Sequence, residues 1–202
     1  MLLDAENIKK ALSQNLPGST SHRRMLPFNR ELLANSEEQT RLKHSSVLLL
    51  LYPENNELHV CLIKRPAHMK HHAGQIALPG GRIEKGETAL ETALRETWEE
   101  IGILPQQIEI LGTLSELYVQ VSRFQIHPFV GWFNTKPEFV ICKDEVEKTI
   151  SFPIKNIQNA IEKVELNTIL GTLKVPCIQF EGEIIWGATA MILSEFGDVL
   201  GL

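Results

Sequence analysis

The stretch GGRIEKGETALETALRETWEEIGI, residues 80–103, concentrates negative charge in a chain whose net charge is already −5. A Gly-Gly loop opens the stretch, and the helical spacing that follows predicts a helix over residues 88–101. Gly102 stands where a helix end favours a left-handed residue. Such crowding of acidic groups needs a physical reason. The glutamates concerned are Glu84, Glu87, Glu91, Glu96, Glu99 and Glu100.

Some of these glutamates share one face of the expected helix. At about 100° per residue, Glu99 and Glu100 fall within roughly 60° of Glu96. One interpretation is a solvated face of an amphipathic helix. However, like charges at these spacings repel, and the helix dipole disfavours negative charge in the last turns. The opposite side is expected to face the core through Leu90, Leu94, Trp98 and Ile101.

A bound divalent cation would offset the repulsion among these glutamates. Carboxylates, together with a backbone carbonyl from the preceding Gly-Gly loop, form a set of hard oxygen ligands. Such ligands suit Mg²⁺ or Mn²⁺ better than zinc. We therefore expect a cation at the face formed by Glu96, Glu99 and Glu100.

At this point the stretch resembles the Nudix box, G-x5-E-x7-R-E-U-x-E-E-x-G-U, where U is a bulky apolar residue. One position departs from the pattern, because Thr97 stands at the first U. The order of expected strands and helices over residues 41–202 also resembles the Nudix α/β/α sandwich, a mixed β-sheet flanked by helices. The matching positions are Gly81, Glu87, Arg95, Glu96, Glu99, Glu100, Gly102 and Ile103.

The resemblance implies hydrolysis of a nucleoside diphosphate linked to another moiety. It also implies that Glu96 or Glu99 orients or deprotonates the attacking water. Glu145, in a later loop, is a further candidate for that role, although residues 143–148 also suit a solvated run of charges. The implied metal ligands are the Gly80 carbonyl, Glu96, Glu99 and Glu100, and the implied structural residues are Glu87, Arg95 and Gly102.

The segment before the box, LIKRPAHMKHHAGQIALPGG at residues 62–81, reverses the sign of the local charge. A basic segment beside a phosphate site suggests a substrate with a phosphate beyond its pyrophosphate. The alternatives are an exposed basic loop without function and a transition-metal site built from histidines. Its basic or potentially basic residues are Lys64, Arg65, His68, Lys70, His71 and His72.

This segment resembles the upstream signature of the Nudix coenzyme A pyrophosphatases, with Arg65, Gly74 and Pro79 at matching positions. Lys70 replaces the second arginine, which keeps the charge but loses bidentate phosphate geometry. The resemblance implies Arg65, Lys70 and Gly74 as substrate-binding residues. It implies cleavage of coenzyme A, or its acyl or oxidised forms, into 3′,5′-ADP and a 4′-phosphopantetheine. The alternatives are a pyrophosphatase for ADP-ribose or a dinucleotide, a silent nucleotide-binding Nudix domain, and a non-enzymatic acidic scaffold.

Outside these motifs, the composition is that of a globular protein, 43% hydrophobic and 22% charged. The apolar run Val47–Leu51 is too short to cross a bilayer, and mild acidity argues against a nucleic-acid surface. Three widely spaced cysteines suggest free thiols in a reducing compartment, so a cytoplasmic protein is expected. The oligomeric state stays open, with a homodimer as one possibility.

The chain is expected to divide into a partly helical N-terminal extension, residues 1–40, and one domain, residues 41–202. The extension is predicted to hold a helix over residues 4–14 and then a surface tether over residues 17–32. The continuous apolar run at 47–52 predicts a strand buried on both faces. Further strands are expected at 58–65, 76–78, 108–117, 125–133, 175–180 and 183–186, and helices at 152–164 and 187–200.

Overall fold

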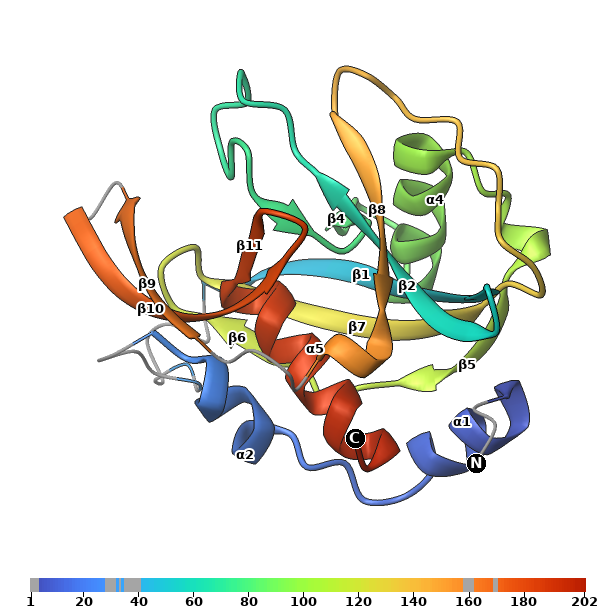
Figure 1. Ribbon diagram of the computed structural model, residues 1–202. Coiled ribbons are helices and arrows are strands. Elements are labelled where there is room, and N and C mark those ends of the chain that lie inside the picture. The colour runs from blue at the N-terminus through green and yellow to red at the C-terminus, as the bar shows by residue number, and fades with distance from the viewer. Residues whose placement is uncertain (1–3, 28–31, 33, 35–40, 158–161, 169–170) are drawn as a thin grey trace.

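The computed structural model describes residues 4–27, 32, 34, 41–157, 162–168 and 171–202 (Figure 1). Its centre is a mixed sheet in the order β3-β2-β1-β7-β5. The central pair, β1 (Lys43–Glu54) and β7 (Phe124–Trp132), is parallel, and the other pairings are antiparallel. The remaining strands of this sheet are β2 (Glu57–Lys64), β3 (Ile76–Ala77), β4 (Gly80–Arg82), β5 (Glu109–Thr113), β6 (Leu117–Val119) and β8 (Lys148–Pro153).

Helices cover both faces of this sheet (Figure 1). Helix α4 (Ala89–Ile101) lies on one face and α5 (Gly187–Leu200) on the other. This arrangement confirms the predicted α/β class with helices flanking a mixed sheet. None of the described helices is long and apolar enough to cross a membrane.

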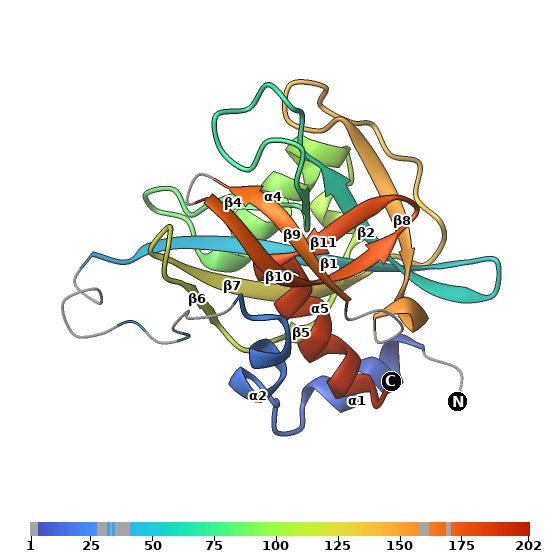
Figure 2. The same ribbon diagram turned by 60° about the vertical axis from the view of Figure 1, so that its left-hand side comes forward.

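A smaller antiparallel sheet, with the order β11-β10-β9, packs against α5 and beside β3 (Figure 2). Its strands are β9 (Glu162–Thr168), β10 (Gly171–Phe180) and β11 (Glu183–Trp186). The β10–β11 pair is the hairpin predicted for residues 175–186.

Strand β1 carries the core of the domain because both of its faces are buried. Leu48 and Leu50 pack in the cluster beneath α4, whereas Leu49 and Leu51 pack in the cluster beneath α5. All four are fully buried, which confirms the doubly covered strand predicted from the continuous apolar run. The hairpin between β1 and β2 is confirmed as well.

The helix predicted over residues 152–164 is wrong. Strand β8 occupies Lys148–Pro153, a single 3-10 turn follows at Ile154–Asn156, and β9 begins at Glu162. Residues 158–161 lie outside the described part of the chain. Pairing of β8 with β2 and of β9 with β10 satisfies the backbone groups of these segments, so tertiary contacts override the helical spacing.

The core-facing stripe predicted for α4 is wrong in part, because Ile101 is fully buried but Trp98 is not. Trp98 is 49% exposed, and Leu90 and Leu94 are only partly buried. Small side chains on the other side let the helix lie close to β1 and β4, and Thr97 satisfies its hydroxyl by donating to the Ala93 carbonyl at 2.7 Å. The buried residues of α4 are Thr92, Ala93, Thr97, Glu100 and Ile101.

The N-terminal helix predicted over residues 4–14 is confirmed as α1 (Ala5–Leu12), capped by the Asp4 side chain. The surface tether is wrong where the structure describes it, because residues 19–25 form α2 (Ser19–His22) and a 3-10 turn packed against α5. The boundary between residues 40 and 41 adjoins residues outside the described part and stays a prediction.

The segment before β1 explains the burial of α5, the helix predicted at residues 187–200. Every residue from Thr189 to Gly197 is buried, so this helix has no solvated face in its centre. His22 and Met25 lie against it and are themselves 2% and 1% exposed. Residues 5–25 therefore complete the core on that side of the sheet.

Candidate active site

The loop and helix of residues 80–103 are held in place by capping groups at both helix ends. Thr88 and Glu91 form a capping box at the N-terminus of α4, with each side chain bonded to the other's backbone N–H. Gly102 caps the C-terminus at φ 77°, in the left-handed region that favours glycine. The helix thus begins and ends where the sequence predicted.

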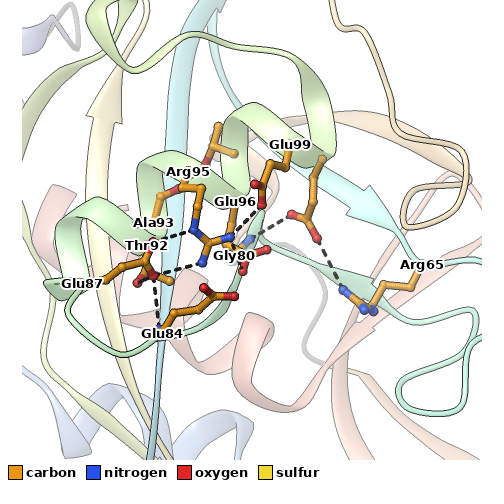
Figure 3. Close-up of polar contacts among 11 residues, drawn as sticks. Arg65, Gly80, Glu84, Glu87, Thr92, Ala93, Arg95, Glu96 and Glu99 are labelled. Atoms are coloured by element: carbon orange, nitrogen blue, oxygen red, sulfur yellow. Dashed lines mark hydrogen bonds and ion pairs between the residues drawn. The ribbon is translucent and has the colours of Figure 1, made fainter.

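Arg95 ties the loop to the helix (Figure 3). Its Nε donates to Glu87 Oε1 at 2.6 Å and its Nη2 to Glu87 Oε2 at 3.1 Å. Glu87 also accepts from the Thr92 hydroxyl and from the backbone N–H of Glu84. These contacts, with Arg95 foremost, lower the pKa of Glu87 to about 2, so the Glu87 carboxylate that Arg95 binds is ionised at neutral pH.

The same guanidinium offsets the repulsion among the glutamates of the helix. Its Nη1 lies 3.0 Å from Glu96 Oε1 and 2.7 Å from Glu99 Oε2. The Glu99 side chain is 46% exposed and points to Arg95, outside the group of acids described below. The metal-binding and catalytic roles of Glu99 therefore stay predictions.

Glu100 is the most deeply placed acid of the site, with 1% of its side chain exposed. Its Oε2 accepts a hydrogen bond from the backbone N–H of Gly80 at 2.9 Å. Its Oε1 lies 3.5 Å from Arg65 Nη1. Burial raises the pKa of Glu100 to about 8, against the lowering effect of the Gly80 N–H and Arg65. The ligand role of the Gly80 carbonyl stays a prediction.

Glu96, Glu100 and Glu145 each bring one carboxylate oxygen within 4.8 Å of the other two. Glu145 comes from the segment between β7 and β8, far from the box in sequence. Burial raises the pKa of Glu96, and Glu99 and Glu145 raise it further. A cluster of hard oxygen donors that destabilise one another's charge fits a divalent cation such as Mg²⁺ or Mn²⁺.

The glycines before the helix make room for this cluster. A Cβ atom on Gly81 would stand 2.2 Å from Glu96 Oε1, and one on Gly80 would stand 2.3 Å from the Ser46 carbonyl oxygen. Any side chain at either position would force the loop away from β1 or displace the Glu96 carboxylate. Gly80 is thus required by the close approach of the β1 backbone, and Gly81 by the position of the Glu96 carboxylate.

The basic segment reaches the same cluster from the opposite side through Arg65 (Figure 3). The backbone N–H of Arg65 donates to the Gln75 carbonyl, and the N–H of Gly74 donates to the Arg65 carbonyl, which closes the loop. Gly74 has φ 67°, so it supports this closure in the left-handed region. Within the described residues, the Nε of Arg65 is buried without a hydrogen-bond partner.

The rest of the basic loop faces solvent. Lys70 is exposed, so the structure does not bury it with Arg65, and its substrate-binding role stays a prediction. In the part of the chain that is described, the gathered metal-ligating group is the acidic one, and it includes none of the loop histidines. These histidines are His68, His71 and His72, all exposed.

Comparison with known proteins agrees with this geometry. The family model described as the NUDIX domain matches residues 42–167. The chain belongs to the Nudix family. It is 37% identical to Nudix hydrolase 3 of Caenorhabditis elegans over 115 residues, which cover 55% of this chain and 48% of the nematode protein. The match thus spans about half of that relative.

The match to a bacterial Nudix relative covers a larger share of both chains. The chain is 32% identical to the uncharacterized Nudix hydrolase NudL of Pectobacterium atrosepticum over 137 residues, or 66% of this chain and 71% of that protein. Among solved structures, the Nudix hydrolase RenU of M. smegmatis aligns with a TM-score of 0.56 at 18% identity, covering 78% of this chain and 85% of RenU. That likeness supports the Nudix fold.

Proposed function

We propose that this Nudix protein is a divalent-metal-dependent pyrophosphohydrolase that cleaves coenzyme A, or its acyl or oxidised forms, into 3′,5′-ADP and a 4′-phosphopantetheine. The observation that carries the proposal is the position of the basic segment, which meets the acidic cluster at Arg65 and continues into the exposed residues Lys70 and His68. A cation site alone would serve any Nudix substrate. The adjoining basic segment supplies the feature that favours a substrate with an additional phosphate.

Glu96, Glu100 and Glu145 are the residues proposed to hold Mg²⁺ or Mn²⁺. When bound, the metal supplies charge neutralisation for the pyrophosphate and acidifies a coordinated water. A carboxylate of the cluster then accepts the proton of the attacking water. Glu96 and Glu145 suit this role because they belong to the cluster, whereas Glu99 lies outside it.

Arg65 is proposed to bind the pyrophosphate itself. Its guanidinium lies at the cluster, and its buried Nε has no acceptor among the described residues. A phosphate oxygen would supply that acceptor and would remove the cost of leaving a buried donor unpaired. The 3′-phosphate must then meet other basic groups, for which Lys70 is one candidate on the exposed loop.

The proposed function is tested by incubating the purified protein with coenzyme A and dephospho-coenzyme A, each with Mg²⁺, Mn²⁺ or EDTA. The products are identified by mass spectrometry. Metal-dependent release of 3′,5′-ADP, faster than cleavage of the dephospho form, is the expected result. Equal cleavage of both substrates would overturn the coenzyme A assignment and leave a Nudix pyrophosphatase for other nucleoside diphosphate derivatives. Absence of cleavage from both would overturn the proposal as a whole.

A further inference from the structure

A pocket of about 480 Å³ opens between the basic loop and the segment that carries Glu145. Its volume lies in the range of small-molecule sites. One wall is formed by residues 66–68 and the other by residues 141–147. The lining residues are Pro66, Ala67, His68, Ile141, Lys143, Val146 and Glu147.

Each wall of this pocket includes a residue that is next in the chain to a residue at the acidic cluster. Pro66 follows Arg65, whose guanidinium contacts Glu100. On the other wall, Val146 follows Glu145, which belongs to the cluster with Glu96 and Glu100. A substrate with its pyrophosphate at the cluster therefore has this pocket as a neighbouring place for one of its two ends.

One cationic side chain on the pocket rim can meet an anionic end. Glu147 also lies on the rim, 3.5 Å from Lys64, which lies closer to Glu183, at 3.0 Å. Lys143 is exposed and, within the described residues, forms no ion pair with a carboxylate. His68 stands on the facing wall. Between these two groups the walls are apolar, which suits the face of a nucleobase.

We propose that this pocket binds the 3′-phosphorylated adenosine end of the substrate, with Lys143 and His68 contacting the 3′-phosphate. The inference rests on the proposed function and assigns its substrate selectivity to Lys143, outside both motifs, and to His68, which lies between Arg65 and Lys70 in the upstream segment. The pantetheine end offers no anion for Lys143 to contact, so we assign that end to the other side of the pyrophosphate, away from the pocket.

Binding of products tests the inference without turnover. Isothermal titration calorimetry in Mg²⁺ compares adenosine 3′,5′-bisphosphate with 5′-AMP, which differ only in the 3′-phosphate. The wild-type protein should bind the bisphosphate about tenfold more tightly or better, as a charge-assisted phosphate contact implies. Lys143→Glu should abolish that preference. The control, Lys10→Glu, changes an exposed lysine on α1, and this variant should still prefer the bisphosphate.

A second variant tests the apolar part of the pocket. Ala67 is exposed at the rim, so Ala67→Phe adds a ring to the opening without disturbing the core. This substitution should weaken the binding of both nucleotides by about tenfold. Equal wild-type affinity for the two nucleotides, an unchanged preference in Lys143→Glu, or unchanged affinities in Ala67→Phe would each overturn the inference.

Failure of this inference can be told apart from failure of the proposed function. If coenzyme A is cleaved but the Lys143→Glu preference is unchanged, the function stands and the pocket assignment is overturned. If coenzyme A is not cleaved but the bisphosphate preference depends on Lys143, the pocket assignment stands for a different 3′-phosphorylated nucleotide. Melting temperatures of all variants establish that each one is folded.

Discussion

The guanidinium of Arg65 lies 3.5 Å from the buried carboxylate of Glu100, so the basic segment and the acidic helix meet at one point. The two motifs are 35 residues apart at this contact. The arginine side chain is 20% exposed, which leaves one side accessible to a ligand. This position is the reason for which we propose that Arg65 binds the pyrophosphate rather than a remote phosphate of the substrate.

Replacement of Arg65 by alanine should therefore raise KM for coenzyme A and for dephospho-coenzyme A alike, by about tenfold or more. Steady-state kinetics with both substrates provides the measurement. Arg65→Lys should recover part of the loss, since it keeps the charge without the bidentate geometry. A loss confined to coenzyme A would instead place Arg65 at the 3′-phosphate.

Glu100→Gln should remove metal-dependent turnover, by about 100-fold or more, while the fold is kept. The amide oxygen of glutamine can still accept from the Gly80 N–H, so the loop stays attached to the helix. Differential scanning fluorimetry should show that Mg²⁺ or Mn²⁺ no longer raises Tm. Glu84→Gln, an exposed position of the same loop, is the matched control. Full activity in Glu100→Gln would refute the ligand assignment.

The raised pKa of Glu100 predicts a pH dependence for the metal-free protein. Between pH about 4.5 and about 8, the folded state keeps a proton on Glu100 that the unfolded chain has released. The free energy of unfolding should therefore fall as pH rises through this window, by at most about 1.4 kcal/mol per pH unit. Urea denaturation in EDTA at several pH values measures the slope. Glu100→Gln should flatten it, and identical slopes would contradict the assignment.

Replacement of Glu195, which lies far from the site, should have a large effect on the free energy of unfolding. It is fully buried on α5, where it pairs with His22 at 2.9 Å and accepts from the backbone N–H groups of Gly18 and Ser115. Glu195→Ala leaves these donors unpaired and should lower the free energy of unfolding by about 3–5 kcal/mol. Glu138→Ala, at an exposed position, should change it by less than about 0.5 kcal/mol. Equal effects of both substitutions would contradict this account.

The sequence predicted the parts of the fold that local chemistry determines. The helical spacing and the glycine at the helix end defined the bounds of α4 within one residue. The continuous leucine run identified the doubly buried strand. In each case the decisive interactions lie within a few residues of one another.

The sequence could not predict features that depend on contacts between distant segments. Trp98 looked like a core residue because an isolated helix does not reveal which side meets the sheet, and here small residues permit the closer approach. A catalytic role for Glu145 could not be preferred over a place in a solvated run of charges, because only the fold brings Glu145 to Glu96 and Glu100. The helix expected at 152–164 failed for the same reason, since pairing with β2 and β10 decides that segment.

The pairing of His22 with Glu195 joins positions 173 residues apart, and this separation has a consequence for synthesis. Residues 5–25 leave the ribosome well before α5 exists, so the α2 segment and Met25 stay without the helix against which they pack. Contacts of such long sequence separation close slowly, and exposed apolar groups favour aggregation in the interval. The nascent chain must therefore keep this early segment out of premature contacts until the last helix emerges.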